Sequence, residues 1–310
     1  DPELIPLGFG LRARGRTVIY DSHEPLPLQV YDKAWIPQPL RPAVSRATRV
    51  LVGSAGRGMS AIVAASPVAE ETFTGARRLV TVNNFPVVDA EALAEDAASA
   101  RPYAERPRDI VYVGGMSPKR GWTQLLEAAR LVHERTGARL TMAGPFQPSS
   151  LADDLQRPEY AAAIEYLGML PPEQARQVMM ESKVGVVLFQ RTPAHERAMP
   201  NKLFEYMAAG VPIVASDFTH WREFLTGPAT GEDGVGCGVL IEPDDPEAVA
   251  RAIQEILADP ERGARMSANG RRAAAENYSW ASEEKKLLAL YEELFRLGKD
   301  GSARSSRPAS

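Results

Sequence analysis

The chain has 310 residues, 44% of them hydrophobic and 25% charged, which is the composition of a globular protein rather than a disordered or fibrous one. Its 36 lysines and arginines against 40 aspartates and glutamates leave a formal net charge of −4, so no overall basic field attracts nucleic acid. The single cysteine, Cys237, excludes an intramolecular disulfide framework and fits a reducing compartment, and no apolar run of about 18 residues is present to span a bilayer.

Strands and helices alternate along the first part of the chain. A stable open sheet of this type has about five or six strands, whereas this part supplies about three. We therefore interpret residues 1–93 as a partial N-terminal domain and expect a stretch that carries its first strands to be missing from this sequence. Helices are predicted over 4–14 and 41–57, and strands over 17–21, 60–66 and 78–82.

A second α/β unit is predicted over residues 108–280. The preceding segment, 94–107, is rich in Ala, Glu, Arg and Pro without a sustained apolar stripe, which indicates an interdomain linker. An amphipathic helix is expected over 281–297 and a disordered tail over 298–310. The fold class is therefore α/β, with two doubly wound, Rossmann-like units. Strands of the second unit are expected at 110–113, 139–142, 164–167, 184–189, 211–215 and 238–241.

Ligands of doubly wound sheets bind beyond the carboxyl ends of the strands, so the loops after strands are the places to search. The loop from Gly114 to Gly121 follows a strand and precedes a helix. Its glycines would let a phosphate approach the backbone, and Lys119 or Arg120 would neutralise the charge. An ordinary tight turn with solvated cations has the same composition. The loop matches neither a Walker motif nor the spaced-glycine dinucleotide fingerprint, which argues against an NTPase and, less strongly, against a dehydrogenase.

A short helix is predicted after Pro200, ending at Gly210. Lys202 and Glu205 are three residues apart and therefore share one face of this helix. They are either a surface ion pair of little energetic weight or a ligand-facing pair, in which the cation binds phosphate and the carboxylate accepts sugar or ribose hydroxyls.

Several segments together resemble the donor domain of glycosyltransferase family 4. The resemblance covers residues 108–297 well and extends more weakly to the acceptor-side half. It implies the GT-B fold, in which two Rossmann-like domains face each other across a cleft, with helix 281–297 returning toward the first domain. The matching segments are Val113–Gly121, Leu140–Gly144, Pro200–Ser216, Trp221–Glu223, Cys237–Leu240 and Asn277–Trp280, with Tyr20–Pro25 and Asn84 in the weaker part.

The resemblance implies a retaining glycosyltransferase of the hexosyltransferase type. Such an enzyme moves a sugar from a nucleotide-sugar donor to an acceptor hydroxyl, without a cofactor or bound metal. The acceptor classes left open are envelope polysaccharide, lipid-linked sugar and secondary metabolite. The family implies a cytoplasmic location, with a peripheral contact at the inner face of the membrane left open, although no basic amphipathic helix is evident. The donor base, the donor sugar and the oligomeric state are undetermined.

The site residues of the family carry over unevenly. Glu205 matches the second carboxylate of the family's Glu-x7-Glu motif, a ribose-hydroxyl ligand, whereas the first carboxylate falls on Arg197. Either a one-residue shift brings Glu196 into that place, or backbone groups around Ala198 to Pro200 hold the donor sugar instead. Pro200 and the adjacent Asn201 are accordingly expected among the donor-binding residues.

The diphosphate-binding arginine and lysine of the family fall on Gly115 and Arg120, so one cation is lost. We hypothesise that Lys202 supplies it from the facing helix, with Gly114, Gly115 and Lys119 forming the rest of the loop. Main-chain groups of Gly168, Met169 and Leu170 match the segment that binds the nucleobase.

His23 resembles the histidine that borders the reacting centre in the acceptor domain, although an isolated histidine is more often structural. The remaining histidines lack cysteine partners and make no zinc site.

Two other classes of function fit the same residues. Arg197, Gly115 and the incomplete first domain favour a non-catalytic homologue that binds nucleotide or sugar. A different GT-B chemistry, such as a nucleotide-sugar epimerase or a phosphorylase, is the other alternative. Nucleic-acid binding is disfavoured, because no Lys/Arg-rich stripe is interleaved with aromatic residues.

Overall fold

The computed structural model describes residues 2–33, 35–87, 101–231 and 234–305. The chain divides into two compact units. The first comprises residues 1–85 together with 280–310, and the second comprises residues 86–279. Each unit is built around its own parallel sheet.

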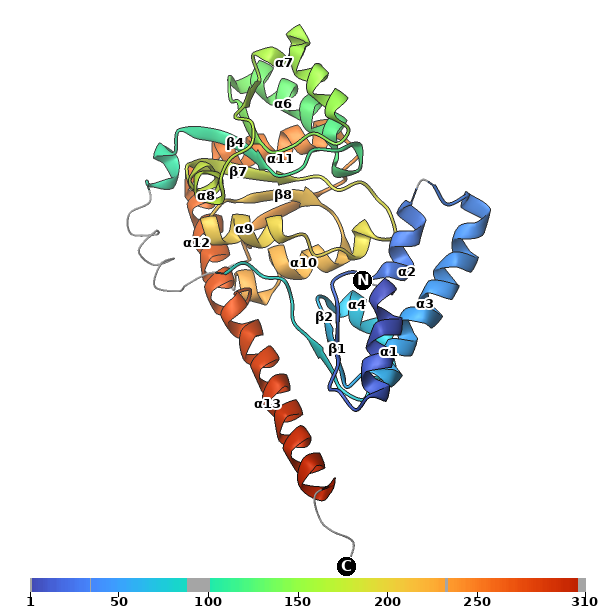
Figure 1. The fold of residues 1–310 in the computed structure, drawn as a ribbon. Coiled ribbons are helices and arrows are strands. Elements are labelled where there is room, and N and C mark those ends of the chain that lie inside the picture. The colour runs from blue at the N-terminus through green and yellow to red at the C-terminus, as the bar shows by residue number, and fades with distance from the viewer. Residues whose placement is uncertain (1, 34, 88–100, 232–233, 306–310) are drawn as a thin grey trace, which may run out of the picture. The chain divides into compact units, whose positions relative to one another are not determined.

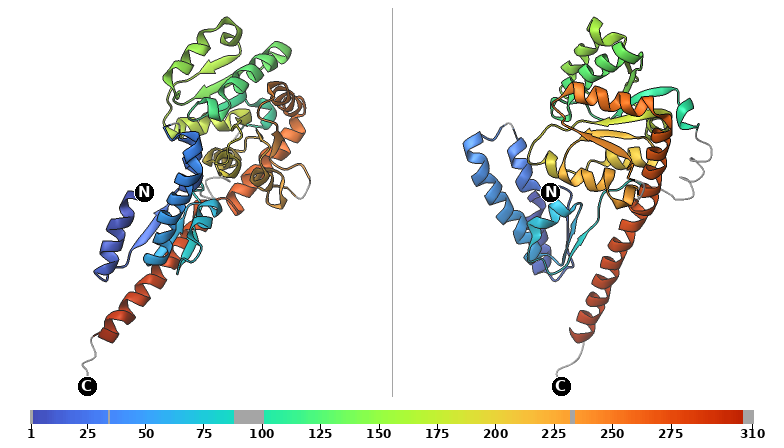
Figure 2. Two further views of the ribbon diagram at one scale, coloured as in Figure 1. Left: turned by 90° about the vertical axis from the view of Figure 1, so that its right-hand side faces the viewer. Right: turned by 180° about the vertical axis from the view of Figure 1, so that it is seen from behind.

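The first unit contains a three-stranded parallel sheet in the order β1-β2-β3. The three strands predicted for this part of the chain are present. Side chains alternate across the sheet, so Ile62 packs with α1 and α3, whereas Ala61 and Val63 face α13 (Figures 1 and 2). The elements are α1 (Ile5–Ala13), β1 (Ile19–Ser22), α2 (Leu26–Gln29), α3 (Arg41–Gly58), β2 (Ala61–Ala64), α4 (Pro67–Glu70), β3 (Leu79–Thr81) and α13 (Trp280–Ser305).

Helix α13 belongs to the first unit although it lies at the other end of the sequence. Leu290 and Leu294 pack against the sheet, and the nearly buried Glu283 carboxylate accepts a hydrogen bond from Asn83 N at 2.9 Å. The helix extends to Ser305, so the tail predicted from residue 298 is wrong over 298–305; residues 306–310 lie outside the described part. The apolar stripe ends near Leu297, but polar residues continue the same helix.

The second unit has a six-stranded parallel sheet in the order β6-β5-β4-β7-β8-β9. Helices α6 and α11 pack on one face, and α8, α9 and α10 on the other (Figure 1). The chain moves outward from β4 in one direction and then returns to β7 on the other side, so the topological switch point lies between β4 and β7. The carboxyl ends of these two strands are therefore the expected place for a ligand.

The elements of the second unit follow the predicted order of strands. They are β4 (Arg108–Val113), α6 (Trp122–Thr136), β5 (Leu140–Ala143), α7 (Pro158–Ala161), β6 (Ile164–Tyr166), α8 (Pro172–Met180), β7 (Ser182–Val187), α9 (Asn201–Ala209), β8 (Ile213–Ser216), α10 (Thr219–Thr226), β9 (Gly238–Ile241), α11 (Pro246–Ala258) and α12 (Pro260–Glu276).

Residues 101–107, expected to be linker, are instead an integral part of the second unit. The buried Arg106 guanidinium donates to Ser182 O at 2.8 Å, Gly210 O at 2.9 Å and Ser267 Oγ at 3.0 Å. The ring of Tyr103 is buried as well. The composition of this segment predicted a linker, but the hydrogen bonds of Arg106 fix the segment to the second unit. Residues 94–100 of the predicted linker lie outside the described part of the chain.

Among the described helices, none is both long enough and apolar enough to cross a membrane.

Candidate functional site

Tyr206 anchors α9 to the carboxyl end of β4. Its buried hydroxyl accepts a hydrogen bond from Val113 N at 3.1 Å and donates one to Val111 O at 3.2 Å. A side chain at Gly185 of β7 would start 2.8 Å from the Tyr206 ring, so the glycine makes room for it. Because Lys202 lies one helical turn before Tyr206, this anchor places Lys202 beside the loop that follows β4.

Replacing Tyr206 by phenylalanine is expected to lower the free energy of unfolding by about 1–3 kcal/mol, because the buried amide of Val113 loses its partner. Urea unfolding of the variant and of Tyr291→Phe, which removes a hydroxyl from the partly exposed face of α13, provides the comparison. Equal stability of the two variants would show that Tyr206 does not anchor the helix.

Lys202 is a buried cation at the switch point. Within the described structure its Nζ atom has no hydrogen-bond partner and lies 3.4 Å from the centroid of the Tyr112 ring. A Cβ atom on Gly114 would be 3.0 Å from this Nζ, so the ammonium lies directly against the glycine loop. Burial lowers the pKa of Lys202 well below its ordinary value, the Arg120 charge lowers it further, and the Glu205 carboxylate opposes both effects.

Glu205 lies on the same face of α9 and is partly buried. Burial raises the pKa of its carboxyl group, and the Lys202 charge opposes this shift. The predicted Lys202–Glu205 pair is therefore not a solvated surface ion pair.

Arg120 brings a second cation to the loop. Its Nη1 atom donates to Gly115 O at 2.9 Å, and its guanidinium carbon lies 5.8 Å from the centroid of the Phe189 ring. A Cβ atom on Gly115 would be 2.7 Å from Nη1. A side chain at position 115 would therefore displace the Arg120 guanidinium. This explains why the residue at this position is a glycine.

The loops after β4, β5 and β6 meet through backbone groups. Gly144 has a φ of 128°, and any side chain there would clash with Gly114 O. Gly114 N donates to Ala143 O at 2.8 Å, and Gly144 N donates to Gly168 O at 2.9 Å. The lack of a side chain at Gly144 therefore lets the backbones of these loops pack closely against each other at this edge of the sheet.

The loop after β7 covers the other side of the switch point. Gln190 N donates to Lys119 O at 2.9 Å, and Trp221 Nε1 donates to Ala198 O at 2.8 Å. Glu196 is exposed, and its carboxylate lies 3.5 Å from Arg191 Nη1. Whether Glu196 takes the place of the first family carboxylate stays a prediction.

The structure brings together Gly114, Gly115, Arg120, Lys202 and Glu205 around the switch point. The other predicted site residues of this unit lie on neighbouring loops and are half-buried or exposed. Gly168 is half-buried after β6, and Pro200 precedes α9. Lys119 and Asn201 are exposed, Met169 is 69% exposed and Leu170 is half-buried.

His23 belongs to the first unit, where its side chain is 74% exposed and its Nε2 atom lies 3.4 Å from Asp21 Oδ2. Its role beside a reacting centre stays a prediction.

Two aromatic residues of the site escaped the sequence analysis. Tyr112 was read only as part of a buried strand, and Tyr206 only as part of a helix. The available signal for Tyr112 was a tyrosine at the next-to-last position of a strand that runs directly into two glycines.

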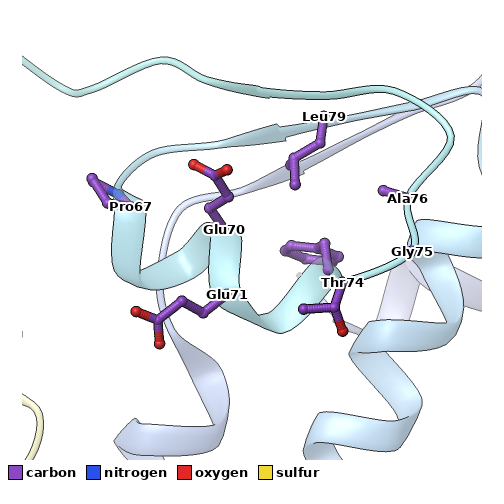
Figure 3. A pocket seen from close by; sticks show the side chains of 8 residues that line it. Pro67, Glu70, Glu71, Thr74, Gly75, Ala76 and Leu79 are labelled. Carbon is purple, nitrogen blue, oxygen red and sulfur yellow. The ribbon is translucent and has the colours of Figure 1, made fainter.

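A separate hollow lies in the first unit and contains none of the predicted site residues (Figure 3). Glu70 and Glu71 lie on one side of it, and the Glu70 carboxylate accepts a hydrogen bond from the Thr81 hydroxyl. Within the described ranges, no three His, Cys, Asp or Glu side chains are grouped as a metal ion would require.

Residues 107–259 match the family model of the group 1 glycosyl transferases. This segment holds the whole switch-point site described above. Over this segment the chain resembles the group 1 glycosyltransferases. The expectation of a GT-B protein of the α/β class is thereby confirmed.

Curated relatives of this chain include two proteins that are each 26% identical to it. One is the MMP alpha-(1->4)-mannosyltransferase of Mycolicibacterium hassiacum, aligned over 188 residues, 60% of this chain and 43% of the relative. The other is the D-inositol 3-phosphate glycosyltransferase of Corynebacterium urealyticum, aligned over 222 residues, 69% of this chain and 49% of the relative. The chain thus spans about half the length of the curated relatives it matches.

Solved structures show the same fold at low sequence identity. Anabaena HepE in complex with UDP has a TM-score of 0.68 at 15% identity, covering 94% of this chain and 77% of HepE. TarM has a TM-score of 0.67 at 15% identity, covering 94% of this chain and 53% of TarM.

Proposed function

We propose that this protein is a retaining, metal-independent glycosyltransferase that uses a nucleotide-sugar donor. The observation that carries the proposal is the buried Lys202 ammonium, which has no hydrogen-bond partner in the described structure and lies at the glycine loop beside Arg120. A buried cation without an acceptor is costly, so a site that keeps one is suited to an anionic ligand. The complexes of HepE with UDP and with UDP-glucose support a nucleoside diphosphate as that ligand.

The two cations would act on the leaving group. Cleavage of the bond between the anomeric carbon and the phosphate oxygen develops negative charge on the nucleoside diphosphate. Lys202 from α9 and Arg120 from the loop after β4 both lie against the glycine loop and would stabilise that charge. They would supply the charge compensation that a divalent metal supplies elsewhere.

Retention would follow from attack on the face from which the diphosphate departs. The acceptor hydroxyl forms its bond to the anomeric carbon as the bond to phosphate breaks, and a departing phosphate oxygen takes the hydroxyl proton. This route requires no carboxylate nucleophile, which agrees with Arg197 in place of the first family carboxylate and with the outward position of Glu196. Glu205 would accept hydrogen bonds from ribose hydroxyls.

The test is product formation by the full-length protein with UDP-, GDP-, ADP- and dTDP-sugars, in the presence of EDTA. We expect transfer from the sugars of one base, and NMR of the product should show the anomeric configuration of the donor. An inverted product would contradict the proposed route. Binding without transfer to any acceptor would favour the non-catalytic homologue, and free epimerised sugar would favour the epimerase.

We also propose a peripheral contact of the first unit with an anionic membrane surface. No aspartate or glutamate occurs between Asp32 and Glu70, a stretch that includes all of α3. The arginines 46, 49 and 57 of α3 are exposed, and Val50 on the same helix is 70% exposed. Helix α3 was not recognised from the sequence as a basic amphipathic helix. Its exposed apolar residues among arginines, with no acidic residue within the helix, favour an interfacial helix.

Vesicle sedimentation tests this contact. The protein is expected to bind phosphatidylcholine vesicles that contain phosphatidylglycerol more strongly than phosphatidylcholine alone. Replacing the three α3 arginines by glutamine should weaken binding by about 1 kcal/mol per residue. The matched control replaces Arg251, Arg265 and Arg272, exposed arginines of the second unit. Equal loss in both triple variants would show that α3 is not the contact.

A further inference from the structure

We infer that Tyr112 is a positioning residue for the diphosphate-binding cation Lys202, which it supports through its ring, while its hydroxyl shares the Gly115 carbonyl with Arg120. The inference rests on the proposed function, because it assigns how this chain arranges the two charges of the same site. Tyr112 occupies the next-to-last position of β4, so its side chain is fixed by the central strand of the sheet.

The ring of Tyr112 is the support for the Lys202 ammonium. The Nζ atom lies 3.4 Å from the ring centroid and has no hydrogen-bond partner in the described part of the chain. The face of an aromatic ring carries negative electrostatic potential, and a desolvated cation gains more from it than a hydrated one. The ring therefore stabilises the charged form of Lys202 without offering it a hydrogen-bond acceptor. The Nζ–H groups stay available for the oxygens of an incoming diphosphate.

The hydroxyl of Tyr112 connects the same side chain to the second cation. It donates to Gly115 O at 2.8 Å, and Arg120 Nη1 donates to the same oxygen at 2.9 Å. The Gly115 carbonyl thus accepts hydrogen bonds from both side chains. These two bonds link the start of the glycine loop to the Arg120 guanidinium. Burial raises the pKa of Tyr112 to about 12, with the Arg120 charge opposing, so the phenol keeps the proton that it donates at neutral pH.

These contacts make two separable predictions. The ring acts on Lys202, so Tyr112→Leu should weaken nucleoside diphosphate binding by about tenfold, the scale of a desolvated cation–π contact. Tyr112→Phe keeps the ring and loses only the contact with Gly115 O, so it should retain most of the affinity. The probe is whichever of UDP, GDP, ADP and dTDP binds the wild-type full-length protein most tightly, with inorganic pyrophosphate as a base-free probe.

A double-mutant cycle separates positioning from a general structural effect. If Tyr112 acts through Lys202, Tyr112→Leu should change affinity little in a protein that already carries Lys202→Met. Equal loss in both backgrounds would overturn the inference. No binding of any probe by the wild type would overturn the proposed function instead, so the two failures are distinguishable.

The pH dependence gives a second readout. The charged or titratable groups that face Lys202 are Arg120 from the loop after β4, Glu205 from α9 and the neutral phenol of Tyr112. Affinity should decline with rising pH as Lys202 loses its proton. Without the Tyr112 ring the charged form of Lys202 is less stable relative to the neutral form, so this decline should begin at lower pH in Tyr112→Leu. A loss of affinity that is the same at every pH would contradict the inference.

A fluorinated series tests the ring without changing its packing. Phenylalanine and its mono-, di- and trifluorinated forms at position 112 weaken the negative face of the ring stepwise at nearly constant shape. Affinity should fall steadily with each fluorine. An unchanged affinity across the series would overturn the cation–π role even if Tyr112→Leu fails to fold.

Discussion

Lys202→Met is expected to bind nucleoside diphosphates about 100-fold more weakly than the wild type, as for the loss of one partner of a buried charge pair. The same change should raise stability, because it replaces a buried ammonium without a hydrogen-bond partner by an apolar side chain of similar length. A gain of about 1–4 kcal/mol is the usual range when a well-packed apolar group replaces buried charge. Binding and stability should therefore change in opposite directions.

The gain should depend on pH in a definite sense. The pKa of Lys202 is lowered in the folded protein and is about 10.4 in the unfolded chain, so between these values the unfolded chain binds more protons. Wild-type stability therefore rises with pH across this window, and the advantage of Lys202→Met is largest below the folded pKa and shrinks toward pH about 10.

Thermal unfolding of Lys202→Met between pH 6 and 10 measures this effect. Lys183→Met is the matched control, because Lys183 Nζ has a carboxylate partner, Asp109 Oδ1, at 3.2 Å. Only the Lys202 variant should gain stability. A lower melting temperature for Lys202→Met at every pH would contradict the assignment of a costly buried cation.

Arg120→Met is expected to lower kcat by about 10²–10³, the usual effect of removing one preorganised group that stabilises developing charge. The fall should appear in kcat more than in KM, because the charge on the leaving diphosphate increases in the transition state. Steady-state kinetics with whichever nucleotide-sugar supports transfer by the wild type provides the measurement.

Arg130→Met is the control for loss of an arginine in the same unit, since Arg130 pairs with Glu127 and Glu134 on the surface of α6. Its kcat should match that of the wild type. If Arg120→Met also matched the wild type, Arg120 would have no part in leaving-group stabilisation.

The parts of the fold that were predicted from the sequence depend on local patterns. The buried strands of the second unit are short apolar runs, and the spacing of Lys202 and Glu205 follows from helical periodicity within α9. The parts that were wrong depend on distant partners. Arg106 was assigned to a linker because its neighbours in sequence are loop-like, but the groups that hold it come from residues 182, 210 and 267.

The candidate site divides in the same way. The glycine loop and the cations are visible as motifs, so Gly114, Gly115, Arg120 and Lys202 could be named in advance. The role of Tyr112 could not, because it depends on a lysine from α9, and three strands lie between β4 and this helix along the chain. Periodicity assigns such a tyrosine to the core and does not indicate which cation lies on its ring.

Isothermal titration of the wild type with UDP, GDP, ADP and dTDP in EDTA tests the central claim most directly. One of the four should bind without a divalent metal, and Lys202→Met should bind that nucleotide about 100-fold more weakly. Absence of binding by all four, or binding only after a divalent metal is restored, would contradict the claim that Lys202 and Arg120 form a metal-independent diphosphate site.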